Sequence, residues 1–367
     1  MKILLLGEYS NVHATLAEGL RELGHKVTLL SNGDFWKDYP RDIDLVRVPT
    51  KIGGIKYFAK LLTILPRLRG YDVVQIINPM FLELKAERIF PTYKYLRKHN
   101  GKMFMGAFGM DYYWVNTCIT SKPLRYSDFN IGDTIRHDPP AEREYIDWLG
   151  TEKERLNKYI AYDCDGIVSG LYEYDVCYRP VFPQKTTFIP YPIKIPNAPE
   201  VQSTNQQKIK FFIGISKSRS TYKGTDIMWR ALIKLQNEHP DKVEIIRAEG
   251  VPFDEYEKMM NRADVVLDQI YSYTPAMNGL LAMSKGKVLV GGGEEENYEI
   301  LGENELRPII NVQPNEQDVY KQLHRLVAKS KELPMLQQQS VEYIRRHHDY
   351  IKVAKQYVEM YKTAKRL

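Results

Sequence analysis

The stretch Asp264-Val-Val-Leu-Asp-Gln-Ile-Tyr-Ser-Tyr-Thr-Pro-Ala-Met-Asn-Gly-Leu-Leu-Ala-Met-Ser-Lys-Gly-Lys-Val-Leu-Val-Gly-Gly-Gly293 carries the clearest fold signal in the chain. Its first five residues predict a short buried strand, and Ile270 to Pro275 predict a loop. Small and apolar residues from Ala276 to Met283 predict a tightly packed helix, and Val288 to Val290 predict the next strand. This order places a helix N-terminus at the carboxyl edge of a parallel sheet, where α/β proteins bind anions and nucleotides.

The same alternation of strands and helices runs through the rest of the chain. A strand at Lys2–Leu6, a turn at Gly7, a helix from about Asn11 to Leu23 and a C-cap at Gly24 open the N-terminal half. Further apolar runs predict strands at Lys26–Leu30, Asp72–Ile77, Lys102–Met105, Gly166–Ser169, Ile209–Ile213, Val243–Arg247 and Val265–Asp268. Strands that alternate with helices predict an α/β fold with doubly wound parallel sheets.

A change in composition divides the chain into two parts. Four prolines between Pro190 and Pro199 precede the polar run Gln202–Gln207, and this pattern is typical of a linker. A chain of 367 residues is too long for one ordinary core. We therefore expect an N-terminal domain at 1–195 and a C-terminal domain at 196–345. Residues 346–367 end a long amphipathic helical stretch that begins near Val341.

Several residues of the stretch quoted above form a recognisable set: Asp264, the apolar strand, Ala282-Met283 and Gly286-Lys287. They resemble the donor-site core of GT-B fold glycosyltransferases, in particular the large bacterial family of retaining, nucleotide-sugar-dependent enzymes. Tyr273 and Leu281 stand where that family has the two acids of its Glu-x7-Glu motif. The resemblance implies two Rossmann-like domains facing each other across a cleft, and a C-terminal helix that crosses back to the N-terminal domain.

The resemblance also implies a function. It indicates transfer of a glycosyl residue from a nucleotide-diphosphate sugar to a hydroxyl of a glycan or glycolipid acceptor, in the synthesis of a bacterial surface polysaccharide or glycolipid. The donor would bind mainly to the C-terminal domain, with retention of anomeric configuration and no other cofactor. Two alternatives stay open: a nucleotide-sugar epimerase on the same fold, and a non-catalytic nucleotide-sugar-binding subunit, which the loss of both glutamates favours.

A basic loop follows the strand that ends at Gly214, and a helix is expected to start near Thr225. Lysine and arginine form charge-assisted hydrogen bonds with phosphate, and a helix N-terminus adds to this attraction. The pair Lys223-Gly224 resembles the Lys-Gly that holds the donor diphosphate in the family. The family's arginine is Ile215 here, so Lys217 or Arg219 would replace it, and Arg219 and Lys223 would stabilise the leaving group. The alternative is a solvated basic loop.

The loop after the strand at Val265–Asp268 supplies the other expected donor contacts. Backbone N–H groups near Ala276, Met277 and Asn278 would point at the donor. Asn278, Tyr271 and Tyr273 could replace hydrogen bonds that the missing glutamates would make. The run Glu294–Glu296 could compensate as well, although we favour a solvated turn for it.

The N-terminal domain is expected to hold the acceptor. Gly7, Glu8, Asn11 and His13 occupy the first strand-to-helix turn. Asn11 could equally cap the helix, and His13 could equally pack in the core. Asp111, in a Gly-x-Asp segment similar to one near the family's acceptor, is the candidate for orienting or activating the acceptor hydroxyl. A weaker candidate for that role is His137.

No metal site is expected from the sequence. Asp163-Cys-Asp165 matches the Asp-x-Asp of metal-dependent GT-A transferases, but it lies between a helix and a strand, and we interpret it as a helix terminus. The histidines form no ligand pair at helical spacing. Cys118, Cys164 and Cys177 have irregular spacing, which predicts neither a disulfide framework nor a metal site and makes a reducing cytoplasm the expected compartment.

The net charge of +6 suits an anionic substrate or an anionic membrane surface, and no nucleic-acid-binding signature accompanies it. No apolar run is long enough to span a membrane. The stretch Ile52–Arg69 is apolar on one face and carries only basic charges. Such a segment could lie in a membrane interface, so peripheral contact with the inner face of a membrane is one interpretation. An ordinary core helix with a basic outer face is the more common one.

Overall fold

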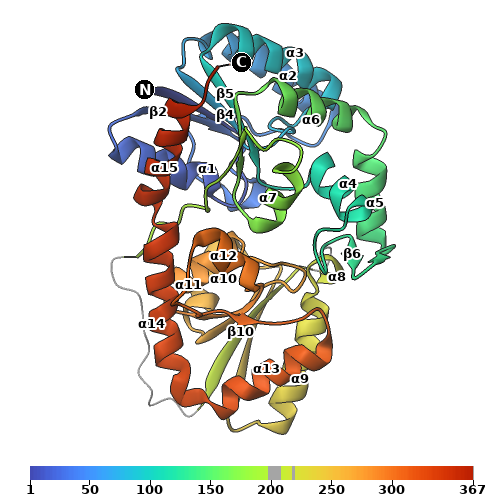
Figure 1. Ribbon diagram of the computed structural model, residues 1–367, viewed down its shortest axis with the longest axis vertical. Helices are drawn as coiled ribbons and strands as arrows, with labels where there is room; N and C mark the ends of the chain where they lie inside the picture. The colour runs from blue at the N-terminus through green and yellow to red at the C-terminus, as the bar shows by residue number, and fades with distance from the viewer. Residues whose placement is uncertain (197–207, 217–219, 367) are drawn as a thin grey trace. The chain divides into compact units, whose positions relative to one another are not determined.

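A computed structural model describes residues 1–196, 208–216 and 220–366. Contacts within the chain divide it into two compact units, each described here by itself (Figure 1). Unit 1 comprises Met1–Pro123, Arg143–Pro192 and Tyr350–Leu367, and unit 2 comprises Leu124–Glu142 and Ile193–Asp349. This division differs from the expected boundaries in the segment Leu124–Glu142, which lies within the first half of the sequence but packs with unit 2.

Unit 1 is built on a seven-stranded parallel sheet with the order β3-β2-β1-β4-β5-β8-β9. The chain builds outward from β1 through β2 and β3, and then returns to the other side of β1 as β4, so the topological switch point lies between β1 and β4. The strands are β1 (Lys2–Leu6), β2 (Lys26–Ser31), β3 (Ile43–Asp44), β4 (Val73–Ile76), β5 (Lys102–Ala107), β8 (Gly166–Ser169) and β9 (Thr186–Phe188).

Helices complete unit 1, and the last of them comes from the end of the chain. Helix α15 packs along α1, where a Cβ at Gly19 would lie 2.5 Å from the carbonyl oxygen of Tyr350, so only glycine permits this approach. Figure 1 shows the two helices side by side. The helices are α1 (Val12–Glu22), α2 (Lys51–Ile64), α3 (Ala86–His99), α4 (Tyr112–Thr120), α6 (Glu152–Asp163), α7 (Tyr172–Tyr178) and α15 (Tyr350–Thr363), with short turns η1 (Phe35–Lys37) and η2 (Leu65–Arg67).

Unit 2 contains a five-stranded parallel sheet with the order β11-β10-β12-β13-β14. Its switch point lies between β10 and β12, because the chain adds β11 on one side of β10 and then continues on the other side. At the amino edge of the sheet, the Asp264 carboxylate accepts a hydrogen bond from Lys210 N at 2.8 Å. The strands are β10 (Ile209–Ile215), β11 (Val243–Glu249), β12 (Val265–Leu267), β13 (Val288–Gly291) and β14 (Ile310–Asn311).

The helices of unit 2 bury apolar faces against this sheet. One core cluster joins β10, β12 and β13 to α9 and α13, and a smaller one joins the sheet to α10 and α11. The helices are α8 (Ser220–Lys223), α9 (Thr225–Glu238), α10 (Phe253–Asn261), α11 (Met277–Ser284), α12 (Glu295–Leu301), α13 (Glu316–Ala328) and α14 (Leu333–Tyr343), with η3 (Ser330–Glu332) and the π-helical η4 (Ile344–His348). Helix α5 (Pro139–Trp148) begins in unit 2 and ends in unit 1.

The C-terminal stretch differs from the single amphipathic helix that the sequence suggested. Helix α14 ends at Tyr343, a π-helical turn follows, and Asp349 is not helical. The backbone of Ile193 pairs with this break by donating a hydrogen bond to the carbonyl of His348 at 2.7 Å. The boundary between the units therefore falls at Tyr350 rather than at residue 346.

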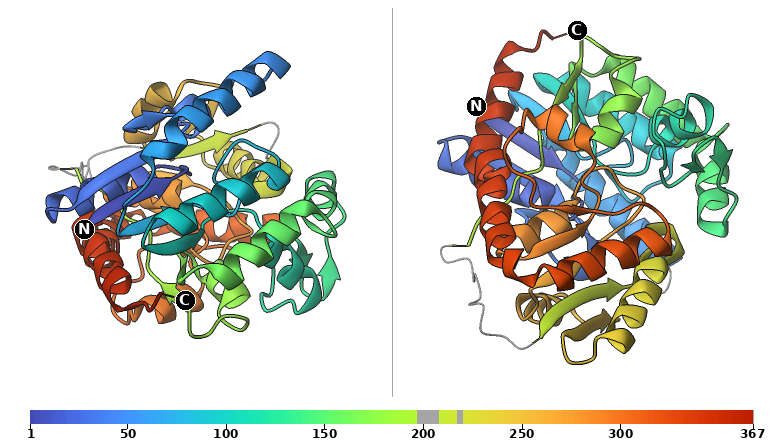
Figure 2. Two further views of the ribbon diagram at one scale, coloured as in Figure 1. Left: turned by 90° about the horizontal axis from the view of Figure 1, so that it is seen from above. Right: turned by 60° about the horizontal axis from the view of Figure 1, so that its bottom comes forward.

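The segment Leu124–Glu142, called the hairpin segment below, contains two short antiparallel strands, β6 (Asn130–Ile131) and β7 (Thr134–Ile135). Gly132 makes the turn between them with a φ of 56°. Figure 2 shows further views of all these elements. In the described part of the chain, no helix combines the length and apolar character needed to cross a membrane.

Candidate functional site

In unit 2, two loops leave the sheet on either side of its switch point. The loop after β10 leads through α8 to α9, and the loop after β12 leads to α11. Both helices begin at the carboxyl edge of the sheet, so their unpaired N–H groups and positive dipole ends lie on the side where open α/β sheets bind ligands.

Gly224 brings the two loops into contact. Its φ is 69°, and a Cβ at this position would lie 2.0 Å from Ile270 Cγ2. The backbone N–H of Ile270 also donates to the carbonyl of Lys223 at 3.0 Å. The pair Lys223-Gly224 is therefore held directly against the second loop. The expected donor contacts Lys217 and Arg219 lie outside the described residues.

Lys223 is half-buried at the end of α8, immediately before the N-cap of α9. Among the described residues, it forms no ion pair, whereas Arg230 on α9 is paired with Asp226 and Glu316. A lysine without a counter-ion beside a helix N-terminus is suited to an anionic ligand.

The second loop is fixed by side-chain hydrogen bonds. Asn278 Nδ2 donates to Asp268 Oδ1 at 3.1 Å, and Tyr256 Oη donates to Asn278 Oδ1 at 3.1 Å. Ala276 is the N-cap of α11, and the first-turn N–H groups begin at Met277. The Asn278 side chain is thus already engaged within the protein, while the backbone of α11 provides the N–H groups that the sequence suggested.

Gly214, another expected donor contact, lies in β10, where a Cβ would be 2.7 Å from the Tyr256 ring.

Tyr273 does not have the exposed position that a donor contact requires. It is buried, and its hydroxyl accepts a hydrogen bond from the backbone N–H of Arg125 at 2.6 Å. Its ring lies 5.0 Å from that of Tyr126, and burial raises its pKa to about 12. These contacts argue against the expected role of Tyr273 and give it a role in holding the hairpin segment.

The hairpin segment is also anchored by acidic residues at the start of α12. The Arg125 guanidinium pairs with Glu294 at 2.8 Å and with Glu296 at 2.5 Å. Glu294 is buried and accepts further hydrogen bonds from Tyr126 Oη at 2.6 Å and from Gln313 Nε2 at 2.7 Å. The solvated turn favoured from the sequence is therefore wrong for Glu294, because hydrogen-bonded partners replace its water.

Arg136, in the same segment, touches both loops of the switch point. Its guanidinium lies 4.0 Å from the centre of the Tyr271 ring. It also donates to the carbonyl of Thr221 in α8 at 3.3 Å, and it pairs with Asp138 at 2.8 Å. One buried arginine thus bridges the loop after β10 and the loop after β12.

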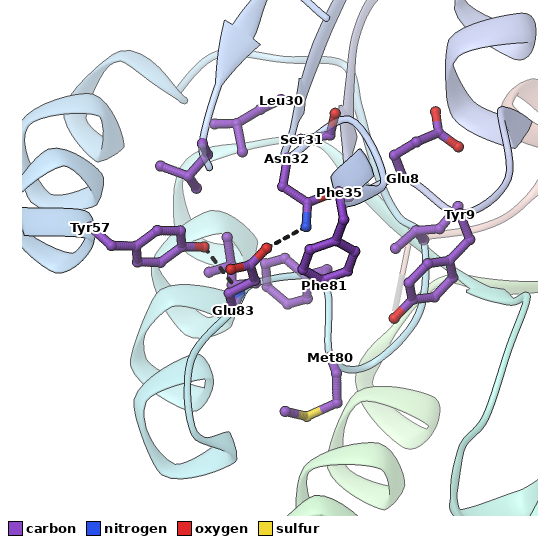
Figure 3. A pocket seen from close by; sticks show the side chains of 14 residues that line it. Glu8, Tyr9, Leu30, Ser31, Asn32, Phe35, Tyr57, Met80, Phe81 and Glu83 are labelled. Atoms are coloured by element: carbon purple, nitrogen blue, oxygen red, sulfur yellow. Dashed lines mark hydrogen bonds between the residues drawn. The ribbon is translucent and has the colours of Figure 1, made fainter. Parts of the chain in front are cut away.

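Unit 1 has a pocket at its own switch point, with a volume of about 180 Å³ (Figure 3). Residues that follow β1, β2 and β4 line it, together with Tyr57 from α2. Asn32 Nδ2 donates to the Glu83 carboxylate, and the backbone N–H of Glu83 donates to Tyr57 Oη at 3.0 Å. The aromatic and polar residues labelled in Figure 3 are Glu8, Tyr9, Ser31, Asn32, Phe35, Tyr57, Phe81 and Glu83.

Gly7 and Glu8 line this pocket, but the Glu8 carboxylate has a structural task. It accepts hydrogen bonds from the backbone N–H groups of His13 at 3.3 Å and Ala14 at 2.7 Å. Burial raises the pKa of Glu8 to about 8. Gly7 has a φ of 84°, and a Cβ there would lie 2.3 Å from Ile77 Cγ2. The turn therefore requires glycine for steric reasons.

His13 is fully buried. Its Nδ1 lies 2.9 Å from the carbonyl of Gly7, which can only accept, so Nδ1 carries the proton. Its Nε2 then accepts from Gln75 Nε2 at 3.1 Å. Burial lowers the pKa of His13 to about 3. These contacts favour the core interpretation of His13. Asn11 is the N-cap of α1 with a φ of 72°, but its side chain makes no capping hydrogen bond.

Asp111 is fully buried at the N-cap of α4. Its Oδ1 accepts from the backbone N–H of Trp114 at 2.9 Å, and its Oδ2 accepts from Tyr178 Oη at 2.7 Å. Both oxygens are thus engaged with the protein, which argues against the role of activating an acceptor. His137 is exposed in the hairpin segment, where its Nδ1 lies 2.5 Å from a carboxylate oxygen of Glu142. The hairpin segment belongs to unit 2, and no residue that lines the pocket of unit 1 is near His137 in sequence.

The Asp-x-Asp sequence has the position expected for a helix terminus. Asp163 ends α6, and Asp165 precedes β8. The Asp165 carboxylate pairs with Arg97 at 2.5 Å and accepts from Met103 N at 2.7 Å. The three cysteines are buried free thiols.

No protein-family model and no curated protein match the sequence. Solved structures match it along nearly its whole length. HepE of Anabaena, in complex with UDP and glucose, has a TM-score of 0.59 at 11% identity and covers 99% of this chain and 100% of its own. Sucrose-phosphate synthase of Thermosynechococcus elongatus has a TM-score of 0.60 at 12% identity, covering 99% and 98%. The catalytic domain of Arabidopsis thaliana starch synthase IV, bound to ADP and acarbose, has a TM-score of 0.53 at 11% identity, covering 99% and 99%.

The fold is GT-B. The sequence correctly predicted this fold and its Rossmann-like sheets. It missed the hairpin segment and with it Arg125 and Arg136, although Gly132-Asp133 between Ile131 and Thr134 is a recognisable signal for a two-residue hairpin. It also missed Asn32 and Glu83, which belong to no recognisable sequence motif. These two residues follow β2 and β4, and they meet because both strands lie next to β1 in the parallel sheet.

Proposed function

We propose that the protein is a glycosyltransferase that moves a sugar from a nucleotide-diphosphate sugar to an acceptor hydroxyl. The observation that carries this proposal is the position of Lys223. It has no ion-pair partner among the described residues and lies at the switch point of unit 2, immediately before the N-cap of α9. Its carbonyl accepts a hydrogen bond from Ile270, in the loop that leads to α11. The complexes of structural neighbours with UDP and with ADP support a nucleotide diphosphate as the ligand.

In the proposed reaction, the bond between the anomeric carbon and the diphosphate oxygen breaks, and its electron pair stays on the diphosphate. The oxygen of the acceptor hydroxyl forms the new bond to the anomeric carbon, and the hydroxyl proton passes to the departing diphosphate. Lys223 and the first-turn N–H groups of α9 and α11 would stabilise the charge that develops there. Charge-assisted hydrogen bonds and helix dipoles could supply this stabilisation without a metal ion. Metal-independence and retention of anomeric configuration are parts of the proposal.

The pocket of unit 1 is the proposed acceptor site. Its aromatic rings suit the apolar face of a sugar, and Asn32 and Glu83 can form hydrogen bonds to hydroxyl groups. We propose a glycan or glycolipid acceptor, in the synthesis of a bacterial surface polysaccharide or glycolipid in the cytoplasm. The proposal gives Asp111 no role in activating the acceptor hydroxyl, because both of its carboxylate oxygens already accept hydrogen bonds from within the protein.

A non-catalytic nucleotide-sugar-binding subunit is the second candidate. Its support is specific: Leu281 packs in an apolar cluster, and the Tyr273 hydroxyl is bonded to Arg125, so neither replaces the acids of the Glu-x7-Glu motif. The nucleotide-sugar epimerase has no comparable support, because Glu8, His13 and Asp111 are all engaged within the protein.

An activity assay with nucleotide sugars separates these candidates. The purified chain would be incubated with UDP-, GDP- and ADP-sugars, with and without oligosaccharide or glycolipid acceptors, while nucleotide release and sugar products are measured. A transferase releases nucleoside diphosphate with an acceptor and forms a glycosylated product. Binding without release indicates the subunit, and a converted sugar that stays on its nucleotide indicates the epimerase.

Arg136 is expected to affect donor affinity by fixing the spacing of the two loops. Replacing Arg136 by alanine removes the ring contact with Tyr271 and the hydrogen bond to Thr221. We expect a loss of about 1–2 kcal/mol, or roughly 5- to 30-fold, in the affinity for UDP or another nucleoside diphosphate measured by titration calorimetry. Arg136→Lys should not restore it, because the planar guanidinium makes both contacts.

The control for Arg136 is Arg143→Ala, which removes an exposed arginine from α5. Its affinity should equal that of the wild type. An Arg136→Ala variant that folds and binds nucleotide with unchanged affinity would show that the two loops keep their arrangement without this residue.

A further inference from the structure

The pocket of unit 1 has an acidic lining. Its charged members are Glu8 and Glu83, and the described residues that line it include no lysine or arginine. Because the Glu8 carboxylate is held by backbone N–H groups at the start of α1, Glu83 is the charged group that a ligand would meet. A carboxylate or phosphate on the ligand would face a like charge here and would have no cation to pair with.

The Glu83 carboxylate is suited to hydroxyl donors. One of its oxygens accepts a hydrogen bond from Asn32 Nδ2 at the wall of the pocket (Figure 3). The guanidinium of the exposed Arg47 donates to the backbone carbonyl of Glu83 at 3.1 Å. Partial burial raises the pKa of Glu83, while the hydrogen bond from Asn32 and the charge of Arg47 oppose this rise. A carboxylate that has lost water in this way gains from hydrogen bonds that sugar hydroxyls donate.

The size of the pocket limits how much of a ligand it can hold. Its volume of about 180 Å³ is smaller than the roughly 300 Å³ at which sites for drug-sized molecules begin. Aromatic and apolar side chains, such as Tyr57 and Phe81, form much of its wall. The pocket therefore suits one sugar ring, and the rest of a longer glycan would extend past its mouth.

Two aromatic rings lie at that mouth, in η1. Phe35 lines the pocket although 66% of it is exposed, and Trp36, the next residue, is 63% exposed. The aromatic wall of the pocket thus continues into solvent. Exposed aromatic rings of this kind can pack against the apolar face of a sugar while the sugar hydroxyls stay in water. We call Phe35 and Trp36 the aromatic rim.

Backbone strain is concentrated around this pocket. Six residues other than glycine have a positive φ in the described part of the chain, and five of them lie in the loops that follow β1 and β2. Both loops contribute to the pocket lining. Such conformations are costly and cluster where a protein fixes a ligand. The five residues are Ser10, Asn11, Asp34, Phe35 and Asp38.

The two basic residues of the loop between β2 and β3 already have acidic partners. Lys37 Nζ pairs with Asp34 at 2.6 Å and donates to the hydroxyl of Ser10 at 3.1 Å. Arg41 pairs with Asp38 and with Asp44, each at 2.6 Å. The aromatic rim thus offers packing surface and no unpaired cation of its own loop, so it favours an uncharged glycan as the pocket does.

We propose that the pocket and the aromatic rim form two adjoining sugar subsites, which accept a neutral oligosaccharide and reject an acidic one. The terminal sugar occupies the pocket and donates hydroxyl hydrogen bonds to Glu83, and the next sugar packs on Trp36. Glu83 is the specificity-determining residue, because it repels a carboxylate or phosphate on the terminal sugar. The inference rests on the proposed function only in identifying this glycan as the acceptor.

Saturation-transfer NMR on the purified full-length chain tests the proposal at pH 8, with and without UDP. The probes are glucose, galactose and N-acetylglucosamine, disaccharides that end in each of them, and the glucose- and galactose-terminated disaccharides with the terminal sugar oxidised to a uronic acid. Glucosamine-terminated disaccharides complete the set. We expect at least one neutral disaccharide to bind, and its uronic acid form to bind about tenfold more weakly or less.

Three variants assign the subsites. Glu83→Gln should reduce the preference for neutral over acidic disaccharides to less than about threefold, because it removes the repelling charge. Trp36→Ala should weaken disaccharide binding by roughly five- to tenfold and leave monosaccharide binding unchanged. Tyr162→Ala is the matched control, because Tyr162 on α6 is an aromatic residue with 64% exposure outside the pocket, and it should bind every probe as the wild type does.

Each contrary outcome overturns a stated part of the proposal. Absence of binding to every probe, or equal binding of neutral and acidic forms, would remove it. A preference for the glucosamine-terminated form would assign the pocket to an ammonium group instead. Nucleotide release from UDP-, GDP- and ADP-sugars, measured on the same preparation, keeps the proposed function separate. Glycan binding without turnover would contradict the transferase and leave the glycan site, whereas turnover without the predicted selectivity would do the reverse.

Discussion

Replacing Lys223 by alanine should lower the affinity of the protein for a nucleoside diphosphate by roughly 10- to 150-fold, which corresponds to about 1.5–3 kcal/mol. Lys223 is the described cation nearest to the N-cap of α9, and it has no carboxylate partner to release before it binds an anion. Its removal therefore deletes a charge-assisted hydrogen bond without creating an unpaired acid. Titration calorimetry with UDP, GDP and ADP measures the effect.

Salt dependence and a matched lysine complete the Lys223 experiment. Lys234→Ala removes an exposed lysine from α9, about two turns beyond the N-terminus of that helix, and should leave affinity unchanged. Wild-type affinity should also fall as salt rises, because a charged contact is screened. If Lys223→Ala and Lys234→Ala bind equally well, the phosphate assignment is lost, and with it the main support for the proposed function.

The fold was predictable because its central strands lie within apolar runs, and this holds even for the three-residue strand β12 between Asp264 and Asp268. The strand expected at Lys2–Leu6 is β1, and the strand expected at Val288–Val290 is β13 with one more residue. Strands β3 and β14 have two residues each, and β9 has three, so they carry almost no periodic signal. They form edges of the sheets, where pairing with a longer neighbour decides their conformation.

The candidate site was less predictable, because sequence identifies residue types but not their partners. Glu8, His13 and Asp111 are polar residues near strand ends, which is where catalytic residues are expected. The structure gives each of them partners that no local pattern reveals, such as Gln75 for His13 and Tyr178 for Asp111. Gln75 in turn accepts a hydrogen bond from Tyr361 at 2.6 Å, 286 residues away in sequence.

Glycines were the most dependable guide to the site. Gly7 and Gly224 both have positive φ angles, and both lack room for a Cβ. Each lies in the strand-to-helix turn beside a switch point, so these two glycines locate the sheet edges at which we propose that ligands bind. The basic loop could be located from sequence for the same reason. Arg136 could not, because this residue contacts Thr221 in that loop from a position 85 residues earlier in the chain.

The second large effect is expected at Asp111. Replacing Asp111 by alanine leaves the N–H of Trp114 and the hydroxyl of Tyr178 without their buried acceptor, so we expect a loss of about 2–4 kcal/mol in the free energy of unfolding. Asp111→Asn keeps one oxygen for the cap and should lose only about 1 kcal/mol. Because the acid serves the fold rather than the reaction, Asp111→Asn should retain nucleotide-sugar turnover to within about threefold.

The pH dependence of unfolding distinguishes a buried acid from an exposed catalytic one. Burial raises the pKa of Asp111 to about 7 from 3.8, so the folded state holds the proton more tightly than the unfolded state. Its contribution to stability is therefore complete below about pH 4 and is lost as the pH rises through 7. The stability of the wild type relative to Asp111→Asn, measured by urea unfolding, should decrease over this interval. A stability difference that does not change with pH, together with loss of turnover in Asp111→Asn, would contradict this prediction, because the carboxyl would then be needed for turnover and would show no sign of a pKa raised by burial.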